Sequence, residues 1–225
     1  MKRFVVIGLG RFGSSLARAL SAGGAEVIAI DRDREVIENI RDQVAVAIRL
    51  DSTDIDALKA QGIDRVDIAV VGMGAGHGFE SAILTVVNLK KLGIPQIFAR
   101  AENTTAGTVF TAIGATEVIY PEIETAQRWA YRLITPHIEE KIDFSPGYSL
   151  ARVSAPASFD GKTVRELQLR QKYNLNLVAI KRSRAVEQEE SGEILNVPMP
   201  ETKVYQDDIL MVAGADADLA RLPQE

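Results

Sequence analysis

The chain opens with an apolar run that breaks into a glycine-rich loop. Residues 4–7 read Phe-Val-Val-Ile, and three glycines follow in the spacing G-x-G-x-x-G, at Gly8, Gly10 and Gly13. A second apolar run ends at Asp31. In a strand–helix–strand unit of this kind the first glycine permits a tight turn, the second lets the backbone approach a pyrophosphate, and the third lets the helix pack closely on the strand. Because N–H groups at the helix start then face phosphates, the pattern predicts nucleotide binding rather than a purely structural turn.

The residue at the end of the second strand bears on the choice of nucleotide. A carboxylate there accepts hydrogen bonds from ribose hydroxyls, so Asp31 favours a free 2′-OH and disfavours NADP. The adjacent Arg32 leaves NADP open as an alternative, because an arginine can accommodate a 2′-phosphate. The third strand ends in Asp51, Ser52 and Thr53, where the adenosine half of a ligand would lie. These residue types also cap helices, and we predict both roles for them.

The fourth strand ends in a glycine-rich loop beside the same crevice. Gly72, Met73 and Gly74 begin this loop, whose glycines allow positive φ and a close backbone approach to a ligand. His77 suggests an acid–base role, but the second of the chain's two histidines, His137, falls outside the expected sheet region and cannot orient it. No nucleophile has a base at recognisable spacing, and no ligand spacing matches a catalytic metal site. The sequence therefore predicts a ligand site without a reaction.

Three charged residues are placed to reach this crevice. Arg11 stands beside Phe12 inside the glycine loop, where a guanidinium can bind terminal phosphates in its own or a neighbouring subunit; the alternative is a solvated surface arginine. Arg100 closes the fifth strand and would supply positive charge to phosphates. Glu122 follows the sixth strand and would hold a divalent cation near phosphates, since hard cations prefer carboxylate oxygen. Stabilisation of a helix N-terminus explains Glu122 equally well.

Apolar runs and helical patterns alternate after the first unit. We expect strands at residues 44–48, 68–71, 96–99 and 117–119, and helices at 55–61, 79–92, 104–113 and 122–134. Six strands that alternate with helices predict an α/β fold with a Rossmann-like, doubly wound parallel sheet. The ligand crevice of such a sheet lies beyond the carboxyl ends of its strands.

The pattern changes after residue 135. The stretch through Pro146 and Gly147 is expected to separate two regions, and we place the domain boundary near residue 140. The domains are then a nucleotide-binding domain at 1–140 and a small α+β domain at 141–225. In the second domain we expect strands at 149–154, 177–181 and 209–213 and helices at 163–167 and 215–222. We interpret the polar stretch 183–200 as a solvated hairpin loop.

Composition excludes several other classes of protein. A net charge of −5 without a basic run argues against nucleic acid as the main partner, because phosphate neutralisation needs clustered Lys and Arg. The lack of cysteine excludes disulfides, thiolate metal sites and thiol catalysis. No apolar run approaches the ~20 residues of a membrane span, and the first residues form a strand in place of a signal peptide. We therefore expect a cytoplasmic protein.

Several segments taken together resemble one family. In the first region they are residues 7–13 (Ile-Gly-Leu-Gly-Arg-Phe-Gly), 30–31 (Ile-Asp), 51–53 (Asp-Ser-Thr), 100–103 (Arg-Ala-Glu-Asn) and 113–122, from Ile-Gly-Ala to Pro-Glu. These segments look like the successive signatures of the RCK/KTN family (TrkA_N plus TrkA_C), in its KtrA/TrkA branch. In the second region, the segments that resemble the C-terminal TrkA_C module are residues 159–167, 170, 172–173 and 178–181. The resemblance as a whole covers about residues 3–220.

The resemblance implies a cytoplasmic regulatory subunit, not an enzyme, of a bacterial potassium uptake system. Such subunits assemble from dimers into a homo-oligomeric ring, commonly an octamer, beneath an integral membrane subunit of the KtrB/TrkH type. ATP and ADP, or NAD(H) in some members, occupy the crevice, and ATP favours the conducting state. By position, Arg11 would sense the ATP γ-phosphate across a subunit interface, and Glu122 would help to hold a divalent cation, Mg²⁺ or Ca²⁺. Arg100 stands where close relatives often have lysine.

The family's C-terminal module can also bind cyclic di-AMP at its dimer interface. The resemblance places this ligand near Val164, Arg165, Leu167, Arg170 and Tyr173. Arg165 departs from the aliphatic residue usual at its position, although an arginine can itself stack on a base.

Two other functions stay open at this point. The glycine loop permits an NAD-dependent oxidoreductase, but the C-terminal region has no histidine to serve as a proton donor. A stand-alone nucleotide sensor without a channel partner is the second alternative.

Overall fold

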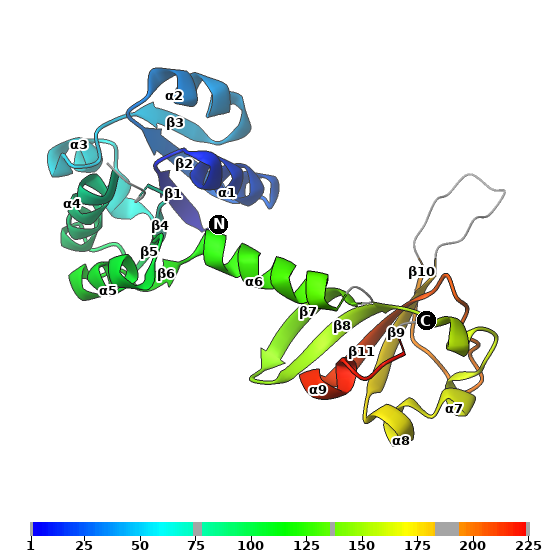
Figure 1. The fold of residues 1–225 in the computed structure, drawn as a ribbon. Coiled ribbons are helices and arrows are strands. Elements are labelled where there is room, and N and C mark those ends of the chain that lie inside the picture. Colours follow the sequence, from blue (N-terminus) through cyan, green and yellow to red (C-terminus); the bar gives the residue numbers. More distant parts are fainter. Residues whose placement is uncertain (1, 74–77, 136–137, 183–193, 224–225) are drawn as a thin grey trace. The chain divides into compact units, whose positions relative to one another are not determined.

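The computed structural model describes residues 2–73, 78–135, 138–182 and 194–223. The chain divides into two compact units, residues 1–124 and 125–225 (Figure 1). The division falls within a helix that begins at Pro121. The predicted domain boundary near residue 140 stays a prediction.

The described residues of the first unit form one parallel sheet. Its strands are β1 (Arg3–Ile7), β2 (Glu26–Asp31), β3 (Val46–Arg49), β4 (Ile68–Val71), β5 (Gln96–Arg100) and β6 (Glu117–Ile119). They are arranged in the order β3-β2-β1-β4-β5-β6, with every neighbouring pair parallel. The first strand, β1, lies in the middle of the sheet. Strands β2 and β3 extend the sheet on one side of β1, and β4, β5 and β6 extend it on the other. This order confirms the predicted Rossmann-like, doubly wound fold.

Helices connect the strands and cover both faces of this sheet (Figure 1). They are α1 (Arg11–Ala22), α2 (Arg34–Ile40), α3 (Ile55–Ala60), α4 (Phe79–Lys91) and α5 (Thr104–Ile113), with 3₁₀ turns at Arg41–Gln43 and Ile63–Arg65. Helix α6 (Pro121–Ile134) follows β6 and is the helix in which the division between the two units falls. The sequence patterns above do not predict α2. Its start is nevertheless well defined, because the carboxylate of Asp33 accepts a hydrogen bond from the N–H of Glu35 at 2.8 Å and so caps the helix.

Side chains alternate along the central strands between two cores. Val5 and Ile7 of β1 join the core under α3, α4 and α5, which also contains Leu89 and Phe110. Val6 points to the opposite face and joins the core under α1 and α2. Because both faces are covered, these strands are apolar throughout, as is usual for parallel sheets. Three polar residues of the predicted site, Asp31, Asp51 and Arg100, lie at or just beyond the carboxyl ends of these strands.

The described residues of the second unit form an antiparallel sheet. Its strands are β7 (Ile138–Ser145), β8 (Tyr148–Ser154), β9 (Asn176–Arg182), β10 (Ile194–Asn196) and β11 (Ile209–Ala215). They are arranged in the order β10-β9-β11-β8-β7. Short helices accompany this sheet, namely α7 (Val164–Leu167), α8 (Leu169–Tyr173) and α9 (Asp216–Leu219), with a 3₁₀ turn at Ala157–Phe159. The second unit is the small α+β module that the sequence predicts.

Two strands of the second unit were not expected from the sequence. Residues 138–145 form β7, a strand that the sequence patterns do not predict, and it pairs with β8 through a turn at Gly147, where φ is 75°. The strand was hidden because β7 lies at the edge of the sheet, and all but its first residue are partly or fully exposed, so it carries charged side chains instead of an apolar run. Within the polar stretch 183–200, Ile194–Asn196 forms β10, which pairs with β9; residues 183–193 lie outside the described part of the chain.

In the part of the chain that the structure describes, no helix is both long enough and apolar enough to cross a membrane.

Candidate nucleotide-binding site

The glycine loop between β1 and α1 is held by close backbone contacts. Gly8 has φ of 87°, and a Cβ atom on it would lie 2.7 Å from the backbone nitrogen of Met73. A Cβ atom on Gly13 would overlap the carbonyl oxygen of Gly8. Gly10 differs from both, because no atom of the described residues lies within 4 Å of the position its Cβ would take. Gly8 and Gly13 are thus required by packing, whereas Gly10 leaves open space in front of α1.

Asp31 anchors this loop from the end of β2. Its Oδ2 accepts a hydrogen bond from the backbone N–H of Leu9 at 2.6 Å, and its Oδ1 accepts one from the N–H of Asp33 at 2.9 Å. A carboxylate has about four lone-pair positions, so both oxygens can still accept a hydrogen bond from a ligand.

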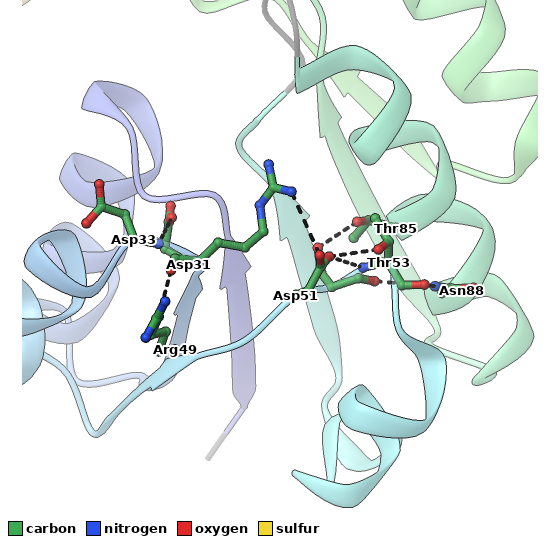
Figure 2. A network of polar contacts seen from close by, with 9 residues as sticks. Asp31, Asp33, Arg49, Asp51, Thr53, Thr85 and Asn88 are labelled. Atoms are coloured by element: carbon green, nitrogen blue, oxygen red, sulfur yellow. Dashed lines mark hydrogen bonds and ion pairs between the residues drawn. The ribbon is translucent and has the colours of Figure 1, made fainter.

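A second polar group follows β3 (Figure 2). Oδ1 of Asp51 accepts hydrogen bonds from the N–H of Thr53 at 3.0 Å and from its hydroxyl at 2.7 Å. These bonds, together with the positive charge of Arg32, hold the pKa of Asp51 below its usual value. The Arg32 guanidinium lies 3.8 Å from Oδ2 of Asp51, so this arginine is already partly neutralised in the structure.

Buried hydrogen bonds attach the residues after β3 to α4. The hydroxyls of Ser52 and Thr85 are hydrogen-bonded at 2.7 Å, and the side-chain amide of Asn88 donates to the carbonyl of Thr53 at 2.9 Å (Figure 2). The side chains of Thr85 and Asn88 were not anticipated from the sequence. Their signal was available, since both are polar residues on the inward face of an apolar helix, where unpaired polar groups would be costly.

Arg100 and Glu122 form an ion pair across the ends of β5 and β6. Nη2 of Arg100 donates to Oε1 of Glu122 at 2.5 Å. This hydrogen bond holds the pKa of the Glu122 carboxyl below its usual value. The Nε atom of Arg100 is buried and has no hydrogen-bond partner among the described residues. Nor do those residues contain a group of three or more His, Cys, Asp or Glu side chains that could hold a metal ion.

These elements enclose a cavity of about 280 Å³ at the carboxyl ends of the strands. The predicted site residues that line it are Gly8, Gly10, Asp31, Arg32, Asp51, Ser52, Gly72, Met73 and Arg100. Other predicted residues do not line it, namely Arg11, Phe12, Gly13, Thr53 and Glu122. Gly74 and His77 lie outside the described residues. Leu50, Gly78 and Ser81 also line the cavity; the serine could have been anticipated from its place in the first turn of α4, at the edge of the crevice.

A second cavity, of about 490 Å³, lies in the second unit. Val164, Arg165 and Arg170 line it together with Leu177, whereas Leu167 is buried in the core. Tyr173 packs against that core, with its ring 6.3 Å from the ring of Phe159. The guanidinium of Arg165 lies 2.6 Å from a carboxylate oxygen of Glu201, and both side chains are exposed.

The strand order, the glycine loop and the polar cavity at the strand ends define a protein of the doubly wound, Rossmann-like class. The TrkA-N domain model matches residues 4–121, and the TrkA-C domain model matches residues 149–223. The chain therefore belongs to the RCK family with TrkA-N and TrkA-C domains, as a KtrA-type regulatory protein of potassium uptake. This family is not enzymatic, so the oxidoreductase alternative is wrong.

Two similar proteins from Bacillus subtilis (strain 168) match along almost their whole length. "Ktr system potassium uptake protein C" is 34% identical over 220 residues, which cover 98% of this chain and 95% of that protein. "Ktr system potassium uptake protein A" is 32% identical over 224 residues, which cover 100% of this chain and 96% of that protein.

Solved structures agree with the fold. A structure described as "Crystal Structure of the GsuK RCK domain" has a TM-score of 0.62 at 18% identity and covers 98% of this chain and 46% of its own. A structure described as "Crystal structure of the GsuK bound to ADP" has a TM-score of 0.50 at 25% identity and covers 59% of this chain and 34% of its own.

Proposed function

We propose that this protein is the cytoplasmic regulatory subunit of a potassium uptake system and that it binds an adenine nucleotide in the cavity at the ends of β1, β2 and β5. The observation that carries the proposal is that the glycine loop, Asp31 and Arg100 all line one cavity. The full-length similarity to two Ktr system potassium uptake proteins supports the same assignment. The similarity to a GsuK structure described as bound to ADP supports an adenine nucleotide as ligand.

The cavity offers a different group to each part of such a nucleotide. The ribose hydroxyls donate to Asp31, which has free lone pairs. The phosphates lie at the N-terminus of α1, where Gly10 leaves room and the helix presents backbone N–H groups. Arg100 adds positive charge to the phosphates, and Asp51 with Ser52 borders the adenosine half.

The regulatory step is a shift between conformations of a homo-oligomeric ring, assembled from dimers and commonly an octamer. ATP and ADP differ only in the γ-phosphate, so only contacts to that phosphate can favour one conformation over the other. Arg11 is exposed at the first residue of α1 and does not line the cavity of its own subunit. This position suits contact with the γ-phosphate of a nucleotide bound by a neighbouring subunit. Glu122 supplies a carboxylate for Mg²⁺ or Ca²⁺ beside the phosphates.

The partner in this proposal is an integral membrane subunit of the KtrB/TrkH type, which translocates potassium. It is supported by the similarity to two Ktr system proteins. The ring would then lie at the inner face of the cell membrane through this partner.

The cavity of the second unit is proposed as a second ligand site, for cyclic di-AMP. Val164, Arg165 and Arg170 line this cavity, and its volume of about 490 Å³ is within the range of small-molecule sites. Leu167 is buried in the core of the second unit and Tyr173 packs against that core, so neither contacts the ligand in this proposal. Arg165 has to leave Glu201 before its guanidinium can stack on a base.

The proposal is tested by titrating the purified full chain with ATP, ADP, NADH and cyclic di-AMP, each with and without Mg²⁺. We expect ATP and ADP to bind and Arg11→Ala to erode the discrimination between them more than total binding. Equal loss of both nucleotides in Arg11→Ala would remove the sensing role of Arg11. Binding of NADH alone among the four ligands would contradict the assignment of the site to ATP and ADP.

A further inference from the structure

In the Arg100 side chain, Nη2 has a hydrogen-bond partner, whereas Nε has none among the described residues. An arginine can present a fork of two N–H groups, on Nε and Nη2, to two oxygens of one anion. Arg182 does so in this chain, with Nε 2.8 Å from Oδ1 and Nη2 2.9 Å from Oδ2 of Asp208. Arg100 instead donates from Nη2 to Glu122 and leaves its buried Nε without a partner among the described residues. A buried donor of this kind needs an explanation, and an anion that reaches both nitrogens would supply one.

The two partners of this ion pair differ in their freedom to move. The Arg100 side chain is 14% exposed and lines the cavity, whereas the Glu122 side chain is 59% exposed in the first turn of α6. Glu122 can therefore turn into water at little cost, because its carboxylate is solvated there. Arg100 would remain at the cavity wall.

Resting on the nucleotide site proposed above, we propose that Glu122 is an internal counter-anion that occupies Arg100 in the empty cavity and competes with a ligand phosphate for it. A phosphate that binds Arg100 through both Nε and Nη2 displaces the Glu122 carboxylate. In the absence of a divalent cation, Glu122 thus lowers the affinity for nucleotide.

The experiment compares the affinity of the full-length protein and of Glu122→Gln for ADP, with EDTA present to remove divalent cations. The amide keeps the size of the side chain but is a weaker partner for a guanidinium than a carboxylate. We expect Glu122→Gln to bind ADP about two- to fivefold more tightly, as suits the loss of a partly exposed ion pair. The melting temperature of each variant, without ligand, checks that it is folded.

Glu102→Gln is the matched control. Glu102 is exposed two residues after Arg100, and in the described part of the chain it does not pair with that arginine. We expect its ADP affinity to equal that of the unmodified protein. Equal tightening in both variants would show a general effect of charge and would overturn the proposal, as would an unchanged or weaker affinity in Glu122→Gln.

A double-mutant cycle with Arg100→Gln tests whether the effect runs through the ion pair. With Arg100 replaced, the further change Glu122→Gln should no longer tighten ADP binding, and persistence of the gain would overturn the proposal. If the unmodified protein binds no nucleotide at all, the proposed function itself fails. If it binds ADP and Glu122→Gln gives no gain, only the counter-anion role fails.

Discussion

The backbone N–H of Leu9 donates to the carboxylate of Asp31 at 2.6 Å, so the acid that ends β2 fixes the glycine loop that follows β1. One side chain thereby shapes the part of the cavity proposed for phosphates and also offers free lone pairs to a ribose. Loop geometry and ligand recognition are coupled through this carboxylate.

Asp31→Ala is predicted to abolish most nucleotide binding. The change removes the ribose acceptor and leaves the N–H of Leu9 without its partner, so the affinity for ADP should fall at least about tenfold. Titration with ADP measures this. Asp33→Ala is the control, because Asp33 caps α2: it should cost about 1 kcal/mol of unfolding free energy and leave ADP affinity almost unchanged. Similar ADP affinities in the two variants would contradict a binding role for Asp31.

Gly10→Ala and Gly13→Ala are predicted to fail in different ways. A methyl group on Gly13 would overlap the Gly8 carbonyl, so Gly13→Ala should destabilise the fold by about 2–3 kcal/mol or more. Gly10 has φ of −64° and open space around its Cβ position, so Gly10→Ala should keep the stability of the unmodified protein. Its methyl group would nevertheless stand where phosphates approach, and ADP affinity should fall.

Urea denaturation and ADP titration of both variants separate these effects. A stable Gly13→Ala protein would show that α1 can shift away from β1. Undiminished ADP affinity in Gly10→Ala would place the phosphates elsewhere.

The N-terminal unit could be predicted closely because its signals are local. β4 and α5 have the expected bounds, since apolar runs and helix caps such as Asn103 lie next to each other in the sequence. β7 could not be predicted in this way, because its residues are mostly exposed and it becomes a strand only by pairing with β8. Strand formation at a sheet edge depends on a partner more than on hydrophobic pattern.

In the candidate site, too, some features could be predicted from the sequence and others could not. The cavity wall at Gly8, Asp31 and Arg100 follows from the rule that parallel strands bring their carboxyl ends to one edge. The Arg100–Glu122 ion pair could not be predicted, because the spacing of these residues does not fix side-chain rotamers. The same holds for the hydrogen bonds that Thr85 and Asn88 make to the loop after β3.

The buried hydrogen bond between the hydroxyls of Ser52 and Thr85 can be tested by substitution. Ser52→Ala and Thr85→Val each leave the other hydroxyl without its 2.7 Å partner, and each should cost about 1–2 kcal/mol of unfolding free energy. The double variant removes both groups, so its loss should be about 1 kcal/mol smaller than the sum of the single losses. Urea denaturation measures all three. Additive losses would mean that the two hydroxyls do not depend on each other.

In the second unit, Lys141 links two carboxylates. Its Nζ lies 2.7 Å from Oδ2 of Asp216 and 2.9 Å from Oδ1 of Asp143, and the hydroxyl of Ser149 donates to Asp216 at 2.6 Å. Burial alone would raise the pKa of Asp216, but the hydrogen bonds from Lys141 and Ser149 outweigh it and hold the pKa below the ordinary value of 3.8. The hydrogen bond from Lys141 also lowers the pKa of Asp143.

The sign of the pH dependence follows from these lowered pKa values. A carboxyl whose pKa is lower in the folded than in the unfolded protein stabilises the fold above its unfolded pKa and loses that contribution as the pH falls through the folded pKa. The second unit should therefore lose stability below about pH 4. Asp216→Asn should be less stable than the unmodified protein at neutral pH and lose less on acidification. Thermal unfolding between about pH 6 and about pH 3 measures this, and Asp207→Asn, at an exposed turn, should retain the steeper profile of the unmodified protein. Parallel profiles for Asp216→Asn and the unmodified protein would show that acid sensitivity arises from other carboxylates.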